Sequence, residues 1–422
     1  MPATRTRPII VQKYGGSSVA DVEKLGRVAD RVVAEKRRGS DVVVVVSAMG
    51  KATDGLLALA RQVAAHDPAS ADPPRRELDM LLSTGERVSM ALLSIAIQAR
   101  GFEAISFTGS QSGILTSDRH FDARIIEVRP HRIEDELARG KIVIVAGYQG
   151  MSYRREITTL GRGGSDTTAV ALAAALEAER CEIYSDVDGV YSADPRAVPD
   201  ARHLPELSHE VLQEMAESGA KVLCAQAVEW ARRAGIAVYA RSTFDAMDGS
   251  ARQTIVRKFA PSEALTARGV VAESNVVLAR LDDRELLDTW LGVAAEANVA
   301  FKDLSVGKGG ASAVISLLNV PDWAGAKRQL LAAIPALDLV EDVAVVSVVG
   351  DGLAGSPEPL RRFLAALRGV EAVPLGVMAG PLRLGAVIDA KRVGEAQRAL
   401  HAVFVAAPGR LVETEARTVP VK

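Results

Sequence analysis

Apolar residues in the first 260 positions follow two alternating patterns. Short continuous apolar runs, such as Pro8–Gln12 and Asp41–Ser47, are typical of strands buried on both faces of a parallel sheet. The segment between them, Val19–Lys36, spaces its apolar residues three or four positions apart, which predicts a helix with one buried face. Strands that alternate with helices favour an α/β fold, here an αβα sandwich with a mostly parallel sheet.

The same two patterns continue through the rest of this region. They predict helices at Leu56–Ala65, Glu77–Gln98, Ala169–Leu176, Ser208–Gly219 and Lys221–Ala234. They predict strands at Ala104–Phe107, Lys141–Ala146, Cys181–Tyr184, Ile236–Ala240 and Gln253–Val256. Ser83–Glu86 interrupts the longest helical pattern, so we expect a bend at Glu86.

The pattern changes after about residue 261. Strands are predicted at Asn275–Arg280, Ala311–Leu318, Val343–Val349 and Leu382–Ile388, and helices at Glu285–Ala297, Trp323–Ile334, Pro359–Leu367 and Val393–Phe404. The repeated order suggests two small βαββαβ modules. We expect a first domain at residues 1–260, modules at 261–340 and 341–408, and a flexible polar tail at 409–422.

Composition narrows the class of ligand. Hydrophobic residues make up 48% of the chain, charged residues 25%, and the net charge is −2, so no strong field attracts nucleic acid or a membrane surface. The longest apolar runs are too short to cross a bilayer, and no apolar signal segment follows the first arginines. Cys181 and Cys224 give neither a disulfide framework nor a zinc site. We expect a soluble, cytoplasmic protein with a small-molecule ligand.

The segment Gly161–Thr168 is the strongest candidate for ligand binding. Its three glycines let the backbone approach a ligand closely, and the helix that follows directs free N–H groups and its dipole at the same spot. Arg162 adds a planar fork for a carboxylate or phosphate, and Asp166 adds a carboxylate for a metal ion or a cation. The alternative is a glycine-rich helix cap in which Arg162 and Asp166 only pair with each other.

Three other loops at strand ends have a similar character. Lys13–Ser18 joins a lysine to two glycines and two serines, which suits phosphate, but it is no Walker loop because the lysine precedes the glycines. Ser47–Asp54 and Ser185–Arg196 also combine glycine with polar and charged residues. Each alone is equally well explained as a solvated turn. Ligands bind at the carboxyl ends of parallel strands, however, and four such loops together favour a site there.

At these residues the chain resembles the aspartate kinases of the amino-acid kinase superfamily. The matching stretches keep the family's order and spacing, and they are Lys13–Val19, Val44–Asp54, Ser83–Arg87, Ile157–Leu176, Tyr184–Arg196, Gly219–Leu223 and Val228–Ala231. The paired C-terminal modules resemble the family's two ACT domains, but much more weakly.

The resemblance implies ATP- and Mg²⁺-dependent phosphorylation of the L-aspartate β-carboxylate to 4-phospho-L-aspartate, the first step of the aspartate-derived amino acid pathway. Lys13 would bridge the transferred phosphoryl group, and Asp166 would orient Lys13 or Mg²⁺. Arg162 would clamp the α-carboxylate of aspartate, and Glu86 would take its ammonium group. The other implied substrate positions are Ser47, Thr53, Tyr148 and Ser165. The other implied nucleotide positions are Gly15, Gly16, Ser17, Ser185, Asp186, Tyr191, Arg196, Lys221 and Val222.

The chain departs from the family pattern beside the expected adenine site, at Ala52, where many members have threonine, and in the ACT-like modules. Cys224-Ala225-Gln226 stands where His-Pro-Arg is common, beside the expected adenine site, so nucleotide affinity would differ. The Pro-Gly turns at which ACT domains bind amino acids are replaced by Arg280–Arg284 and Val349–Glu358, and Leu375–Pro381 replaces a Ser/Thr-rich effector strand. We therefore expect weakened or absent feedback by lysine or threonine, with the ACT-like modules serving mainly to form a homodimer.

Two other functions stay open on the sequence alone. One is a sister kinase acting on glutamate, acetylglutamate, carbamate or a uridine nucleotide, although Glu86 with Arg162 favours a free α-amino acid. The other is a catalytically inactive amino-acid sensor. The presence of Lys13, Arg162 and Asp166 argues against a sensor, as do the altered ACT loops.

Overall fold

The computed structural model describes residues 7–65, 73–220, 223–246, 250–258, 266–318, 320 and 322–406. Its first domain is built on an eight-stranded sheet in which the β13–β14 pair is antiparallel and the other pairs are parallel. In spatial order the strands are β12 (Glu206–Ser208), β14 (Gln253–Arg257), β13 (Val238–Ser242), β9 (Arg180–Ser185), β1 (Ile9–Tyr14), β2 (Asp41–Val46), β6 (Ile142–Ala146) and β3 (Ala104–Phe107). The mostly parallel sheet is therefore confirmed.

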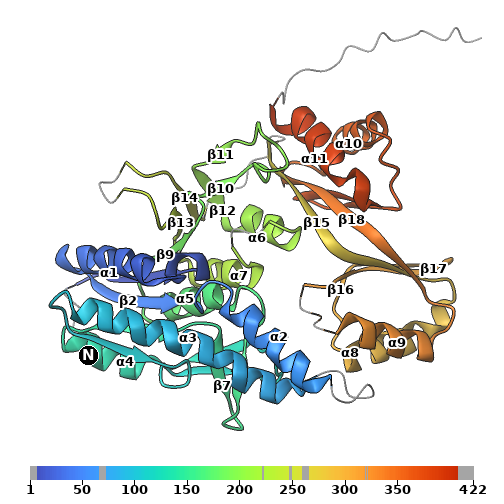
Figure 1. Cartoon of the computed structure of the whole chain (residues 1–422). Helices are drawn as coiled ribbons and strands as arrows, with labels where there is room; N and C mark the ends of the chain where they lie inside the picture. The colour runs from blue at the N-terminus through green and yellow to red at the C-terminus, as the bar shows by residue number, and fades with distance from the viewer. Residues whose placement is uncertain are drawn as a thin grey trace, which may run out of the picture.

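Helices cover both faces of this sheet. One face packs against α4 (His131–Ala138), α5 (Gly164–Ala175), α6 (His209–Glu217) and α7 (Ala225–Ala234). The other face packs against α1 (Val22–Arg37) and α3 (Arg75–Gln98), and α2 (Ala52–Ala64) lies against α3. Within β2, Val43 points into the first core and Val44 into the second, because successive side chains of a strand alternate in direction. The αβα sandwich is confirmed (Figure 1).

A four-stranded sheet in the same domain was missed by the sequence patterns. Its spatial order is β5 (Ile125–Val128), β4 (Ile114–Thr116), β7 (Gln149–Ser152) and β8 (Ile157–Thr159). These strands are only three or four residues long and mix polar with apolar side chains, so no apolar run marks them. A separate hairpin pairs β10 (Val190–Tyr191) with β11 (His203–Leu204).

Helix α3 runs without interruption, so the predicted bend at Ser83–Glu86 is wrong. A Cβ on Gly85 would stand 2.8 Å from Ala48 Cβ, which shows that the glycine serves close packing against the β2–α2 loop. In the described part of the chain α3 is also the one helix long and apolar enough to cross a membrane. However, half of its apolar window is buried, and α3 contacts β3, β6 and β8. It is therefore a core helix of this domain.

Two long antiparallel strands, β15 (Thr266–Leu281) and β18 (Asp338–Asp351), form the centre of the C-terminal sheet (Figure 1). The full spatial order is β16 (Phe301–Gly307), β17 (Gly310–Ser316), β15, β18, β20 (Arg383–Asp389) and β19 (Gly376–Ala379). Helices α8 (Leu287–Glu296) and α9 (Trp323–Ala333) pack near one end, and α10 (Glu358–Gly369) and α11 (Val393–His401) near the other. The short helices are η1 (Gly16–Val19), η2 (Arg284–Leu286), η3 (Ala390–Arg392) and η4 (Ala402–Ala406).

The two C-terminal modules share both long strands. Val277 of β15 belongs to the core under α8 and α9, whereas Val270 of the same strand belongs to the core under α10 and α11. The expected limit between residues 340 and 341 falls inside β18, whose two halves face different cores. The sequence patterns had marked only the later half of β15 and had missed β16 and β19. The domain limits stay a prediction, and the tail at 409–422 lies outside the described residues.

Candidate active site

Lys13 and Asp166 form a buried ion pair at the carboxyl edge of the large sheet. Lys13 Nζ lies 2.6 Å from Asp166 Oδ1, and the two side chains are 11% and 10% exposed. Lys13 stands near the end of β1, and Asp166 lies in the first turn of α5. Asp166 Oδ1 accepts no hydrogen bond within the described residues, so this contact is a charge pair without hydrogen-bond geometry. The structure thus brings together the two residues that the sequence placed in one site.

The turn that follows Lys13 packs tightly against the loop after β2. The Gly15 N–H donates to the carbonyl of Tyr184 at 3.1 Å, and η1 begins at the next residue. A Cβ on Gly16 would stand 2.9 Å from the carbonyl oxygen of Ala48, so no larger residue fits there without movement. Ser17 follows in η1. The turn therefore lies between the ends of β2 and β9, with Lys13 beside it.

The turn before α5 requires glycine at residue 163. Its φ is +76°, and a Cβ there would stand 2.3 Å from the Cβ of Cys224. Thr167 Oγ1 lies 3.3 Å from Cys224 Sγ, so Cys224 packs directly on this turn. The exposed side chain of Arg162 projects from the same turn, next to the N-terminus of α5. A helix N-terminus with an adjacent guanidinium suits an anion.

Glu86 is buried beside the first turn of α2. Its Oε1 accepts a 3.0 Å hydrogen bond from the N–H of Ala48, whereas Oε2 has no hydrogen-bond partner within the described residues. Burial raises the pKa of Glu86 to about 7. Ser47 precedes Ala48 and is half-buried, and Thr53 lies in the first turn of α2. An unpartnered buried carboxylate oxygen is suited to a cationic ligand group.

Tyr148 occupies a strained backbone position between the two glycine loops. Its φ is +68°, and its N–H donates to Thr168 Oγ1 at 3.2 Å. The pKa of Tyr148 is raised to about 12, mainly by burial. The charge of Glu86 contributes to this rise and that of Arg162 opposes it, so both groups lie within electrostatic reach of the ring. A Cβ on the preceding Gly147 would stand 2.8 Å from Ser165 Oγ, which places Ser165 beside this turn.

The expected nucleotide residues lie around the end of β9 and the β10–β11 hairpin. Ser185 ends β9 and is half-buried, and Asp186 is exposed. The Tyr191 hydroxyl donates to Asp188 Oδ1 at 2.8 Å. Arg196 forms a two-pronged contact with Asp194, at 3.0 and 2.8 Å. Lys221 and Val222 lie outside the described residues, so the structure does not place them.

Asp79 was missed in the sequence although it lies next to this site. It is fully buried on α3, two helical turns before Glu86, and accepts hydrogen bonds from Thr159 Oγ1 at 2.5 Å and from the Phe121 N–H at 3.0 Å. His120 Nδ1 lies 2.6 Å from the other carboxylate oxygen. A charged residue seven positions from Glu86, on the same helical face, is the signal that would have revealed it.

The residues at this edge fit a magnesium ion that is shared with a nucleotide. No group of three or more His, Cys, Asp or Glu side chains that could hold a metal occurs in the described ranges. Mg²⁺ in phosphoryl-transfer sites, however, needs only one or two carboxylates because phosphate oxygens and water complete its shell. Asp166 Oδ1 already contacts Lys13 Nζ, so Asp166 would serve as such a single carboxylate ligand through its other oxygen.

Comparison with known proteins identifies relatives over most of the chain. The Amino acid kinase family matches residues 8–242. An aspartokinase of Corynebacterium glutamicum is 42% identical over 410 residues, which cover 94% of this chain and 96% of that protein. An aspartokinase of Mycolicibacterium smegmatis is 53% identical over 279 residues, and that match covers 65% of each chain, less than two thirds of the relative's length.

A solved structure supports the fold over the same length. The structure of E. coli aspartokinase III in complex with aspartate and ADP, in its R-state, matches with a TM-score of 0.79. The match covers 93% of this chain and 99% of that chain at 24% identity, which shows the fold alone. The expected family is confirmed by the sequence relatives and the expected fold by this likeness. The chain belongs to the amino acid kinase family and, within it, to the aspartokinases.

Proposed function

We propose that this chain transfers the γ-phosphoryl group of ATP to the β-carboxylate of L-aspartate, and that the reaction takes place beside Lys13. The observation that carries the proposal is the 2.6 Å contact of Lys13 with Asp166, buried between a glycine turn and the N-terminus of α5. A lysine beside two anion-binding backbone turns is suited to transfer of a phosphoryl group. The named relatives are aspartokinases, which supports the choice of acceptor.

The reaction needs charge neutralisation more than proton transfer. The β-carboxylate is already ionised near pH 7, so no general base is required. One of its oxygens attacks the γ-phosphorus, the bond to the bridging oxygen breaks, and ADP leaves with that oxygen. Lys13 neutralises charge that spreads over the transferred group, while Gly15, Gly16 and Ser17 hold the phosphates. Asp166 holds the ammonium group of Lys13 in place.

The aspartate would bind between α3 and the turn before α5. Glu86 takes its ammonium group, because Glu86 Oε2 is buried and has no hydrogen-bond partner within the described residues. Arg162 binds the α-carboxylate. Ser47, Thr53, Tyr148 and Ser165 line the remaining sides, and their positions around Glu86 and the glycine turns support this assignment.

The nucleotide would extend from Lys13 towards the end of β9. Ser185, Asp186, Tyr191 and Arg196 are assigned to its base, ribose and phosphates, together with Lys221 and Val222. Bound Mg²⁺ would neutralise phosphate charge, with Asp166 as its protein ligand. The assignments of Ser185, Asp186, Tyr191 and Arg196 rest on the family resemblance and on their location around the end of β9 and the β10–β11 hairpin. Those of Lys221 and Val222 rest on the resemblance alone.

Three properties outside the site complete the proposal. Feedback by lysine or threonine is weakened, because the loops at Arg280–Arg284 and Val349–Glu358 lack the usual effector turn. The chain forms homodimers through its C-terminal sheet, whose edge strands β16 and β19 carry exposed Leu304 and Val377. The protein acts in the cytoplasm, which its composition and small net charge support.

A hydroxylamine assay tests the proposed activity directly. Purified protein is supplied with Mg-ATP and L-aspartate, and hydroxylamine traps the acyl phosphate while ADP release is followed. We expect hydroxamate with aspartate and little with glutamate, acetylglutamate or carbamate, and no change with millimolar lysine or threonine. Product from another acceptor in preference to aspartate contradicts the substrate assignment. Inhibition by lysine or threonine contradicts weakened feedback while leaving the kinase activity in place.

A further inference from the structure

Thr243 connects the two parts of the proposed ATP site. Its hydroxyl lies 2.6 Å from the hydroxyl of Ser18, which belongs to the turn proposed to hold the phosphates. Its backbone N–H donates at 2.9 Å to the carbonyl of Ser185, the residue that ends β9. The Ser18 side chain is fully buried and that of Thr243 is 4% exposed. One buried residue, 225 positions from Ser18, therefore contacts both halves of the site.

Arg31 holds Thr243 from the side of α1. One of its terminal nitrogens donates to the carbonyl of Thr243 at 3.1 Å and to that of Asp245 at 2.7 Å. Its guanidinium also stacks over the ring of Tyr184, 5.0 Å from the ring centroid. Thr243 and Asp245, at the start of the segment after β13, are thus attached to the core helix α1.

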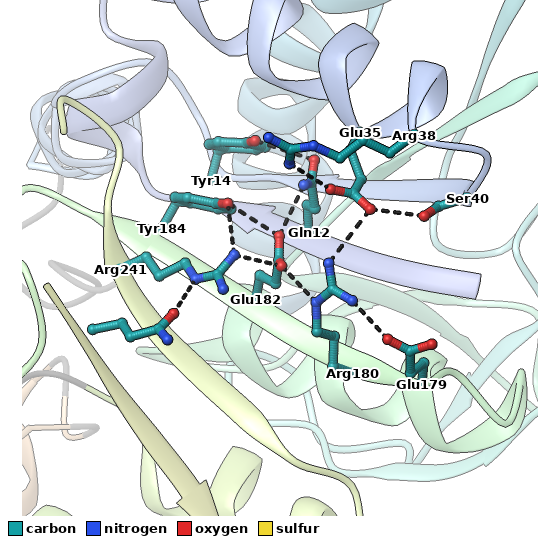
Figure 2. A network of polar contacts seen from close by, with 11 residues as sticks. Gln12, Tyr14, Glu35, Arg38, Ser40, Glu179, Arg180, Glu182, Tyr184 and Arg241 are labelled. Carbon is teal, nitrogen blue, oxygen red and sulfur yellow. Dashed lines mark hydrogen bonds and ion pairs between the residues drawn. The ribbon is translucent and has the colours of Figure 1, made fainter. Parts of the chain in front are cut away.

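The strands that carry these groups are joined by a buried polar network (Figure 2). The network includes Gln12, which lies on the opposite face of β1 from Lys13 because successive side chains of a strand alternate in direction. Glu182 of β9 is fully buried and accepts from Gln12 of β1 at 2.9 Å and from Arg241 of β13 at 2.5 Å. Tyr184 donates its hydroxyl to the same carboxylate at 3.0 Å. The network links β1, β9 and β13, and the ends of these three strands lead to Lys13, Ser185 and Thr243.

We propose that Thr243, acting through its hydroxyl contact with Ser18, is a positioning residue that sets the phosphate-binding turn relative to the nucleotide-binding end of β9. Because both hydroxyls are buried and bonded to each other, Thr243 acts through Ser18 and not on the substrate. The proposal rests on the proposed function, since it gives ATP to this site. It goes further by naming a residue that governs ATP binding and leaves aspartate binding unchanged.

Substitutions at both ends of the contact test this role. Thr243→Val keeps the shape but removes the hydroxyl, and Ser18→Ala removes its partner. Losing one buried hydrogen bond corresponds to roughly a three- to tenfold rise in KM for ATP and in Kd for ADP. KM for aspartate should change less than about twofold. Thr243→Ser keeps the hydroxyl and should retain the ATP affinity of the wild type. The double variant Ser18→Ala/Thr243→Val should bind ATP no more weakly than whichever single variant has the lower affinity, because both substitutions remove the same interaction.

A matched control separates positioning from general destabilisation. Thr116 and Thr158 form another buried hydroxyl pair, at 2.5 Å, in the four-stranded sheet. Thr116→Val should lower the melting temperature to a similar extent without changing ADP affinity. Three results would each overturn the positioning role. The first is an equal rise in KM for ATP and for aspartate in Thr243→Val, and the second is unchanged ADP affinity in that variant. The third is a loss of ADP affinity in Thr116→Val equal to that in Thr243→Val. A wild-type protein that binds ADP but does not phosphorylate aspartate overturns the proposed function instead, and the ADP titrations still decide the role of Thr243.

Discussion

Ser192 and His401 form a buried hydrogen bond between the first domain and the C-terminal region. Ser192 Oγ lies 2.8 Å from His401 Nε2, and the Ser192 carbonyl accepts from the Val270 N–H. Ser192 directly follows Tyr191 in β10, so helix α11 and strand β15 both contact the hairpin that carries a proposed nucleotide residue. The hairpin therefore depends on the C-terminal region of its own chain for its position.

Removing the imidazole should loosen this hairpin. Burial, and then the positive charge of Arg202, lower the pKa of His401, so the ring is neutral near pH 7. His401→Ala should lower the free energy of unfolding by about 1–3 kcal/mol, because it removes a buried hydrogen bond and leaves a cavity. Hydrogen exchange of residues 190–205 should become faster, which mass spectrometry can measure. His131→Ala is the control, since the His131 side chain is 84% exposed and its loss should leave exchange unchanged. Unchanged exchange in His401→Ala would contradict the dependence.

The lysine of the buried ion pair should be required for catalysis and not only for stability. Lys13→Ala and Asp166→Asn should lower kcat by about 10²–10³-fold, the usual effect of removing one transition-state contact. Lys36→Ala is a closely matched control, because Lys36 pairs with Asp41 at 2.8 Å with similar burial, but at the amino end of β2. That variant should lose stability and keep its kcat per folded molecule. Equal kcat values for Lys13→Ala and Lys36→Ala would rule out a catalytic Lys13.

Aspartate binding should strengthen as pH rises through neutrality. Because burial raises the pKa of Glu86 to about 7, the carboxyl is mostly neutral at pH 6 and mostly ionised at pH 8. Only the ionised form attracts the ammonium group, so KM for aspartate should fall by about tenfold between these pH values, in proportion to the ionised fraction. Glu86→Gln should raise KM and remove this dependence. A pH-independent KM in the wild type would contradict the role of Glu86.

The raised pKa of Glu86 also affects the stability of the protein without aspartate, which should fall, and not rise, with increasing pH. The folded pKa of Glu86 lies above its unfolded value, so the native state keeps a proton that the unfolded chain has released. The contribution of Glu86 to stability is therefore present at low pH and is lost as pH rises from about 4.5 to 7. Glu86→Gln should lessen the fall in melting temperature over this range, which calorimetry without aspartate can measure.

Sequence patterns predicted the large sheet, and marked the glycine loops of the candidate site, where one local signal carries the information. The runs in β1 and β2 are apolar because helices cover both faces of the sheet. The glycines at strand ends mark positions where a side chain would collide with a neighbour, as a Cβ on Gly16 would with Ala48. Lys13 and Asp166 were placed together because both belong to glycine-containing loops and because the family resemblance assigns both to one site.

The features that were missed depend on contacts between distant residues. Gly85 suggested a bend because a glycine in a helix is unfavourable, and only its packing against Ala48 explains it. The first half of β15 contains Arg268 and Glu273 and is a strand because β18 pairs with it. The contact between Ser18 and Thr243 joins residues in different loops, and the sequence around neither residue predicts it.

Substitution of Gly163 tests whether backbone conformation and contact with Cys224 together restrict this position, in the turn before α5, to glycine. Gly163→Ala should destabilise the protein for two reasons: φ is +76°, and the new Cβ would stand 2.3 Å from the Cβ of Cys224. Gly235→Ala separates the reasons, because Gly235 also has a positive φ, +68°, but nothing lies within 4 Å of its Cβ position. Backbone strain alone should cost Gly235→Ala about 1 kcal/mol, whereas Gly163→Ala should lose more and should also lose kinase activity as the turn moves. Cys224→Gly should recover part of that loss in the double variant, since it removes the collision. If urea unfolding shows that the two alanine variants are equally stable, Cys224 does not constrain the turn. The presence of cysteine at residue 224, where the family commonly has histidine, then has no effect on the site through this contact.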